Sequence, residues 1–271
     1  MSSPTQVLEA DGCRAEVDLR HGARLASLTV AGLELVATSG KDTYHWGSFT
    51  LAPGAGRLRG GRFEHGGREF GFPLTAPPHA IHGLVVDVPW EQLGPASAGV
   101  ELPAPWPWPG RVRQMLRLEP DRLESRLELH ADEPMPAAMG WHPWFPRPLN
   151  RASDSRQLGP LKLDVHPGRM YAHGPDGLPT GDLIEPASRP WDYCFVDLAA
   201  PPRLQWLGDD EGFELSVESD CPCWVIYDEE PQAICVEPWT APPNSLNLPN
   251  PTVVDPAKPL EAVMVWRWRS M

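Results

Sequence analysis

Two histidines and one glutamate stand where the chain could use them for proton transfer. His142 lies between two tryptophans and directly before a proline in the stretch MGWHPWFP, and His82 precedes a glycine in HAIHG. Glu237 follows the apolar run AICV and precedes a proline, which restrains the backbone beside it. Imidazole and carboxylate groups can give and take protons near neutral pH, so these residue types indicate general acid–base chemistry.

Each of these side chains also has a purely structural interpretation. His82 can cap a turn, His142 can be a core histidine with its second nitrogen on a backbone carbonyl, and Glu237 can be a strand-end carboxylate in solvent. If the end of its strand is buried instead, desolvation would raise the pKa of Glu237 and make it a better base near neutrality.

The sequence gives little support for a metal, a cofactor or a disulfide framework. His79 and His82 would point to opposite faces of a strand, so they could converge on a metal only in a turn. No set of Cys, His and Asp has the spacing of a structural zinc site. We expect five reduced thiols, with a local redox or metal role for the Cys221-Pro-Cys223 stretch as the alternative; they are Cys13, Cys194, Cys221, Cys223 and Cys235.

Composition narrows the classes of partner. The chain has 271 residues, of which 41% are apolar and 22% charged, which is typical of a globular protein with a sizeable core. Its net charge is −13 and it has no basic cluster, so nucleic acid and anionic membrane surfaces are not expected partners. No apolar run approaches the roughly 18 residues of a membrane span, and the polar N-terminus lacks the pattern of a signal peptide, so we expect a cytoplasmic protein.

The elements that must position these side chains are predicted to be short strands. The 34 prolines and 24 glycines divide the chain into short segments, and no stretch of a dozen residues shows a helical period. Apolar and polar residues alternate over 122–130 and 264–268. Further strands are predicted at 26–37, 111–119, 160–166, 193–198, 213–218, 223–227 and 233–237. This spacing favours an all-β fold, a large antiparallel β-sandwich.

One proline-rich stretch is predicted to be a loop. The segment 98–110 contains PAPWPWPG and is expected to form a stiff surface connection. Its tryptophans could alternatively flank a ligand.

Six motifs, in order along nearly the whole chain, resemble those of the aldose 1-epimerase (galactose mutarotase) family. Each is moderately specific alone, and their shared order makes the resemblance strong. They are the opening strand Gly22–Leu28, the arginine motif Leu51–Arg57 with GGRF at 60–63, the first histidine motif His79–Gly83 with Trp90, the second histidine motif Gly140–Phe145, the aspartate motif Trp191–Phe195, and the glutamate motif Val236–Thr240 with Asn244 and Asn247.

The resemblance implies a single domain over residues 1–271, a sugar cleft across one sheet of a sandwich, and no need for a cofactor or metal. Carried over by motif, Glu237 would be the general base and His142 the general acid. His82 would bind the sugar and help polarise its ring oxygen, while Arg57 and Asp192 would hold hydroxyl groups. The base would take the proton of the C1 hydroxyl while the acid protonates the ring oxygen, so the ring opens and recloses as the other anomer.

The chain departs from the family pattern at three positions, which leaves the identity of the sugar open. Gly56 stands where the family often has asparagine, Trp144 where it has tyrosine, and Leu84 where a second glycine follows the first histidine motif.

Two alternatives to a free-aldose mutarotase follow from the same sequence. A hexose-6-phosphate mutarotase would need cations for the phosphate, for which Arg59, Arg62 and Arg147 are candidates. The third reading is a sugar-binding sandwich without turnover. The sequence leaves open whether the protein is a monomer or a homodimer.

Overall fold

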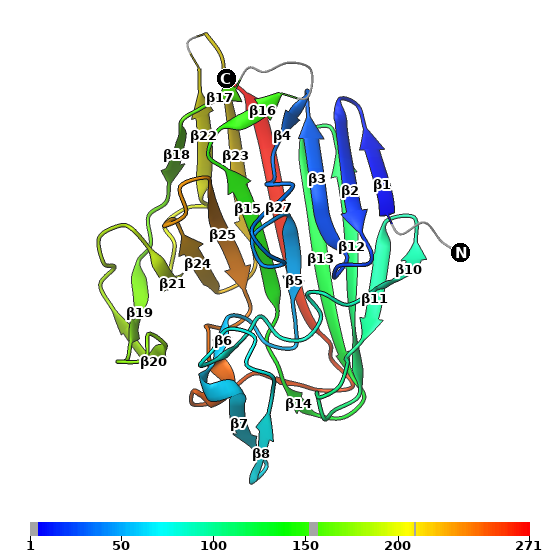
Figure 1. The fold of residues 1–271 in the computed structure, drawn as a ribbon, viewed down its shortest axis with the longest axis vertical. Coiled ribbons are helices and arrows are strands. Elements are labelled where there is room, and N and C mark those ends of the chain that lie inside the picture. Colours follow the sequence, from blue (N-terminus) through cyan, green and yellow to red (C-terminus); the bar gives the residue numbers. More distant parts are fainter. Residues whose placement is uncertain (1–4, 152–156, 209) are drawn as a thin grey trace.

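The protein is an all-β, antiparallel sandwich (Figure 1). The computed structural model describes residues 5–151, 157–208 and 210–271. Within these ranges the helical structure consists of two 3₁₀ turns, η1 (Arg59–Gly61) and η2 (Ser245–Asn247). None of the described helical segments has the length and apolar character to cross a membrane.

The larger sheet has 13 strands and carries His142 and Glu237 on two central strands, β15 and β25. Eleven of its strands follow one another in space, in the order β17 (Gln157–Leu158), β16 (Leu149–Arg151), β4 (Leu33–Glu34), β3 (Arg24–Val30), β5 (Ser48–Leu51), β15 (Gly140–Pro146), β25 (Ala233–Trp239), β24 (Cys223–Tyr227), β21 (Asp192–Val196), β19 (Arg169–His173) and β20 (Pro179–Ile184). The other two, β1 (Thr5–Ala10) and β2 (Cys13–Asp18), join the sheet through the pairing of β2 with β3.

The second sheet has eight strands and packs against the first. Its order is β10 (Glu91–Gly94), β11 (Ser97–Glu101), β12 (Gly110–Glu119), β13 (Arg122–Ala131), β27 (Leu260–Ser270), β23 (Gly212–Ser219), β22 (Arg203–Leu207) and β18 (Leu161–Asp164). Three small pairs complete the fold: β14 (Met135–Pro136) with β26 (Val253–Val254), β6 (Arg57–Leu58) with β9 (Ala80–Ile81), and β7 (Arg62–His65) with β8 (Arg68–Gly71).

Alternating side chains build the core between the two sheets. On β13, every second residue from Leu123 to Ala131 is buried, as the period of two in the sequence predicts. The core includes three fully buried tryptophan or phenylalanine rings from both sheets, Phe145, Trp206 and Trp266. Burial of these large rings contributes to the stability of the two packed sheets.

Most predicted strands are confirmed, and two predictions are wrong in part. The segment 26–37 is not one strand, because Ala31 and Gly32 have φ values of 48° and 80° and turn the chain into the β3–β4 hairpin. The segment 98–110 is not all loop, because β11 covers its start, and Trp106 is 8% exposed and packs against Phe63 and Phe72.

A second, smaller cluster lies on the other face of the larger sheet. On β25, Ile234 and Val236 belong to the core between the sheets, while Cys235 and Trp239 belong to this second cluster. Glu237 shares the parity of Cys235 and Trp239, so its side chain projects from the same face. The β6–β9 pair and the β19–β20 hairpin supply further walls to this side of the sheet.

Candidate active site

Glu237 and His142 face each other across two hydrogen-bonded strands. The β15–β25 register pairs Gly140 with Trp239 and Trp144 with Cys235, which places residue 142 opposite residue 237. His142 Nε2 lies 3.5 Å from Glu237 Oε2. Both residues line a cavity of about 380 Å³. Glu237 is 1% exposed, so the interpretation of it as a strand-end carboxylate in solvent is wrong.

Glu237 and His142 each have a buried polar atom without a hydrogen-bond partner. Glu237 Oε2 and His142 Nδ1 are buried and accept or donate no hydrogen bond. Buried polar atoms normally find partners, and leaving one unpaired costs about 1–3 kcal/mol. The structure therefore holds unused hydrogen-bonding capacity at the floor of the cavity, where a polar ligand would satisfy it.

Burial dominates the electrostatics of this pair. Desolvation raises the pKa of Glu237 well above its usual range, and the charge of Asp192 adds to the increase while Arg57 opposes it. Desolvation also lowers the pKa of His142 well below its usual range, helped by His82. The pair is thus a strong base when the carboxylate is ionised and a strong acid when the imidazole is protonated.

Aromatic rings hold the imidazole of His142 in place. It stacks on Phe49 of β5 at 4.7 Å and on Trp144 at 5.3 Å between ring centroids, each with an interplanar angle of 20°. Trp144 is itself fixed because its Nε1 donates a hydrogen bond to the carbonyl of Tyr44, at 2.8 Å. The tryptophan that departs from the family pattern therefore forms part of the support of His142.

His82 reaches the same cavity from the turn after β9. Its φ is +62°, and its backbone N–H donates to the carbonyl of Gly56 at 2.9 Å. Gly83 must lack a side chain, because a Cβ there would lie 2.2 Å from the carbonyl oxygen of Ala52. The His82 ring meets the His142 ring edge-on at 4.9 Å, and its Nδ1 is buried without a partner. Burial, together with the charge of Arg57, lowers the pKa of His82 to about 3, so the ring is neutral at neutral pH.

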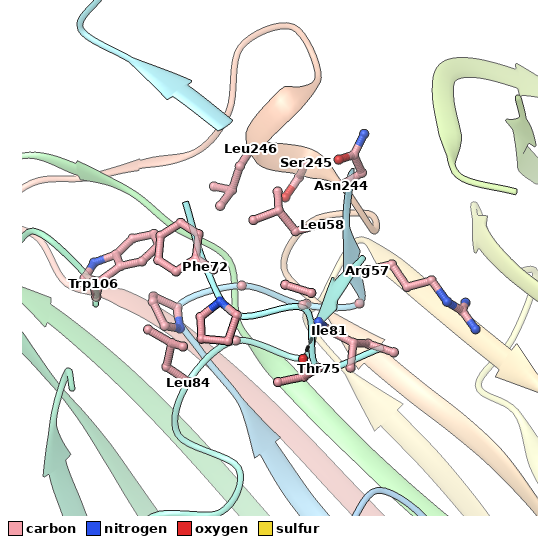
Figure 2. Close-up of a pocket in the computed structure, with 17 residues that line it drawn as sticks. Arg57, Leu58, Phe72, Thr75, Ile81, Leu84, Trp106, Asn244, Ser245 and Leu246 are labelled. Carbon is pink, nitrogen blue, oxygen red and sulfur yellow. Dashed lines mark hydrogen bonds between the residues drawn. The ribbon is translucent and has the colours of Figure 1, made fainter. Parts of the chain in front are cut away.

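Arg57 and Asp192 meet at the rim of the cavity. Arg57 Nη1 donates to Asp192 Oδ2 at 3.3 Å, and both side chains are partly exposed. Arg57 also borders a second, small cavity of about 50 Å³ with a mostly apolar lining (Figure 2). Figure 2 shows its side chain pointing away from Trp106 and Leu246, so apolar packing lies behind the arginine while its charge faces the larger cavity.

A hydrogen bond and a strand pairing stabilise the wall of the cavity beside Arg57 (Figure 2). The backbone N–H of Ile81 donates to Thr75 Oγ1 at 3.0 Å, and Arg57 pairs with Ile81 in the β6–β9 ladder. The small cavity has no titratable lining residue besides Arg57, so the acid–base chemistry belongs to the larger one.

The structure brings together all five residues that the sequence selected, and it adds others. Glu237, His142, His82, Arg57 and Asp192 all line the larger cavity. Sequence reasoning missed further polar lining residues from scattered segments, namely Tyr44, His45, His173, Tyr227 and Glu229. No short motif marks these five, since only the folded sheet brings their segments to one cavity.

The other two departures from the family pattern, Gly56 and Leu84, have different structural consequences. A Cβ at Gly56 would lie 2.8 Å from the Trp239 ring and 2.9 Å from Pro243, so these side chains occupy the space that an asparagine would enter. Leu84 lies in the wall of the small apolar cavity, away from the larger one.

His79 does not join His82 at a metal. Its Nδ1 accepts a hydrogen bond from the N–H of Gly60 at 3.2 Å, so it supports the η1 turn. All five cysteines are buried and free. Among the described residues, a different group, His142 with Cys235 and Glu237, has one potential metal-ligand atom from each residue within 4.8 Å of the others.

The fold is an antiparallel sandwich that carries a buried carboxylate–imidazole pair on its larger sheet. A model of the aldose 1-epimerase family matches residues 4–256 of the chain. The chain belongs to this family.

Solved structures share the fold over almost the full length. A putative aldose 1-epimerase from Escherichia coli K12 is 20% identical, with a TM-score of 0.79 over 98% of this chain and 99% of that one. A galactose mutarotase-like protein from Clostridium acetobutylicum is 15% identical, with a TM-score of 0.79 over 98% and 95%. Galactose 1-epimerase from Lactobacillus acidophilus is 18% identical, with a TM-score of 0.74 over 97% and 93%. The search of curated protein sequences found no significant match.

Proposed function

We propose that the protein is an aldose 1-epimerase that interconverts the α and β anomers of a free aldose. The observation that carries this proposal is the buried Glu237–His142 pair, with 3.5 Å between Oε2 and Nε2, at the floor of a polar cavity. A pyranose offers that pair two reacting oxygens on one carbon, the C1 hydroxyl and the ring oxygen. Family membership and the shared fold add support.

In the proposed mechanism, Glu237 takes the proton of the C1 hydroxyl and His142 gives a proton to the ring oxygen. The C1–O5 bond breaks, the aldehyde turns about C1–C2, and the reversed transfers close the ring on the other face. His82 donates a hydrogen bond to the ring oxygen, while Arg57 and Asp192 bind hydroxyl groups at the rim. Each proton transfer of this kind contributes roughly 10²–10⁴-fold to the rate.

The pair needs one shared proton for each turnover. A neutral carboxylic acid beside a neutral imidazole holds as many protons as a carboxylate beside an imidazolium, and transfer across the pair interconverts the two. Burial favours the uncharged arrangement in both partners. We therefore expect the pH–rate profile to lack the inflection near pH 6.5 that an ordinary histidine would produce.

The arginines considered for phosphate are engaged elsewhere, which favours a free aldose over a hexose 6-phosphate. Arg59 Nε lies 2.7 Å from Asp176 Oδ2, and Arg62 pairs with Glu69 on the β7–β8 hairpin.

Arg147 is also unavailable to a phosphate. It donates hydrogen bonds to the backbone carbonyls of Asp228 and Glu230. Among the Lys and Arg residues that the structure describes, Arg57 is the one that lines the larger cavity. Asp42, Asp192 and Glu229 line the same cavity and supply opposing negative charge. Such a lining repels a phosphate dianion.

Exchange spectroscopy by NMR tests the proposal against both alternatives. We expect the protein to speed exchange between the α and β C1–H signals of glucose or galactose, with little effect on glucose 6-phosphate. Faster exchange of the phosphate alone would establish the second enzyme reading. Saturable sugar binding without faster exchange would make the protein a binding sandwich.

A further inference from the structure

A thiol lies beside the proposed acid–base pair and has no part in the mechanism above. Cys235 is two residues before Glu237 on β25, so both side chains leave the same face of the strand. It is also the ladder partner of Trp144, two residues from His142 on β15. One ligand atom from each of His142, Cys235 and Glu237 lies within 4.8 Å of the others.

The three side chains form a buried group with open donor capacity. Cys235 is fully buried, Glu237 is 1% exposed and His142 is 7% exposed. Glu237 Oε2 has no hydrogen-bond partner and lies 3.5 Å from His142 Nε2, so no hydrogen bond to this oxygen must be broken to bind an ion.

The donor set suits zinc better than a hard cation. Thiolate, imidazole and carboxylate are the three ligand types of Zn²⁺, at roughly 2.0–2.3 Å, whereas Mg²⁺ prefers oxygen ligands only. Three protein ligands with an open fourth position is the arrangement of an accessible zinc site. Ligand atoms within 4.8 Å of one another need to close by about 1 Å for tetrahedral contact, which side-chain rotation can supply.

We propose that His142, Cys235 and Glu237 form a binding site for a thiophilic divalent cation of the Zn²⁺ type, which blocks the proposed mutarotase reaction when it is occupied. The ion enters through the larger cavity, which His142 and Glu237 line. It displaces the thiol proton of Cys235 to solvent and occupies both the proposed base and the proposed acid. The inhibitory part rests on the proposed function, while the binding part does not.

Calorimetric titration of the chelator-treated protein with Zn²⁺ tests the site without reference to turnover. We expect one equivalent to bind to wild type, no comparable binding of Mg²⁺, and an affinity at least roughly 10–100-fold weaker in Cys235→Ala. Cys223→Ala is the matched control, since Cys223 is a buried cysteine of the same cluster on the adjacent strand and lies outside the ligand group. Equal affinity in wild type and Cys235→Ala would overturn the assignment.

Cobalt substitution provides a second test of thiolate ligation that requires no variant. Co²⁺ bound to the wild-type protein should show the near-ultraviolet charge-transfer band of a thiolate ligand, and a bound Co²⁺ without that band would also overturn the proposal.

Mutarotation measured in chelator and then with one equivalent of Zn²⁺ separates inhibition at this site from the proposed mutarotase function. If the protein is active in chelator and stays active with one equivalent of Zn²⁺, inhibition at this site is refuted. If the protein is inactive in chelator but still binds Zn²⁺, only the proposed function is refuted.

Discussion

Acid should destabilise the protein through His82. This ring is 5% exposed, and its pKa in the folded protein is about 3, against an ordinary value of 6.5. Because the folded-state pKa is lowered, the neutral ring's contribution to stability is complete above pH 6.5. It is lost as the pH falls toward 3, since the unfolded chain binds the proton first.

The size of the effect follows from the two pKa values. Each pH unit between them is equivalent to about 1.4 kcal/mol, so the full loss between pH 6.5 and 3 is about 5 kcal/mol, and the loss by about pH 4.5 is about 3 kcal/mol. A typical domain is stable by only about 5–15 kcal/mol, so a loss of this size is a large part of its total stability.

The variant His82→Asn isolates this contribution. Asparagine does not titrate and tolerates the positive φ of residue 82. Urea unfolding at several pH values should show wild type losing about 3 kcal/mol relative to the variant between pH 7 and about 4.5. The exposed His166, changed to asparagine, is the control and should show no such divergence. A constant difference between wild type and His82→Asn at every pH would refute the burial argument.

Three further outcomes are expected. Since burial raises the pKa of Glu237 above its ordinary 4.5, Glu237→Gln should gain stability relative to wild type as the pH rises above 4.5, measured by urea unfolding. Trp144→Ala should lower kcat by up to roughly 10²-fold by freeing His142, and Trp144→Tyr should restore most of it, measured by polarimetry. Gly56→Asn should destabilise the fold by about 1–3 kcal/mol through contact with Trp239, whereas Gly60→Asn, with open space around it, should cost less in thermal unfolding.

Local sequence pattern was sufficient for strands with one buried face. The alternation over 122–130 predicted β13, because each second side chain enters the core. The β3–β4 hairpin escaped prediction, because the apolar run continues through Ala31–Gly32 and conceals the turn. Burial of Trp106 escaped it too, since that packing comes from the distant β7–β8 hairpin.

The site was predictable as a set of residues and not as a geometry. Motif order identified Glu237 and His142, but their facing positions depend on the register of two strands about 90 residues apart. The same register brings in Cys235, which no spacing rule connects to His142. Tertiary contacts also decide that Arg59 pairs with Asp176. A single domain and a cytoplasmic location stay predictions, and the oligomeric state stays open.

The most direct test of the central claim is the optical rotation of freshly dissolved α-D-glucose and α-D-galactose, followed with wild type and Glu237→Gln side by side. The account predicts that wild type speeds the approach to anomeric equilibrium and that the variant is slower by roughly 10²–10⁴-fold. The exposed Glu229→Gln variant serves as a control for the loss of one carboxylate at the cavity. Equal rates for wild type and Glu237→Gln would contradict the mechanism.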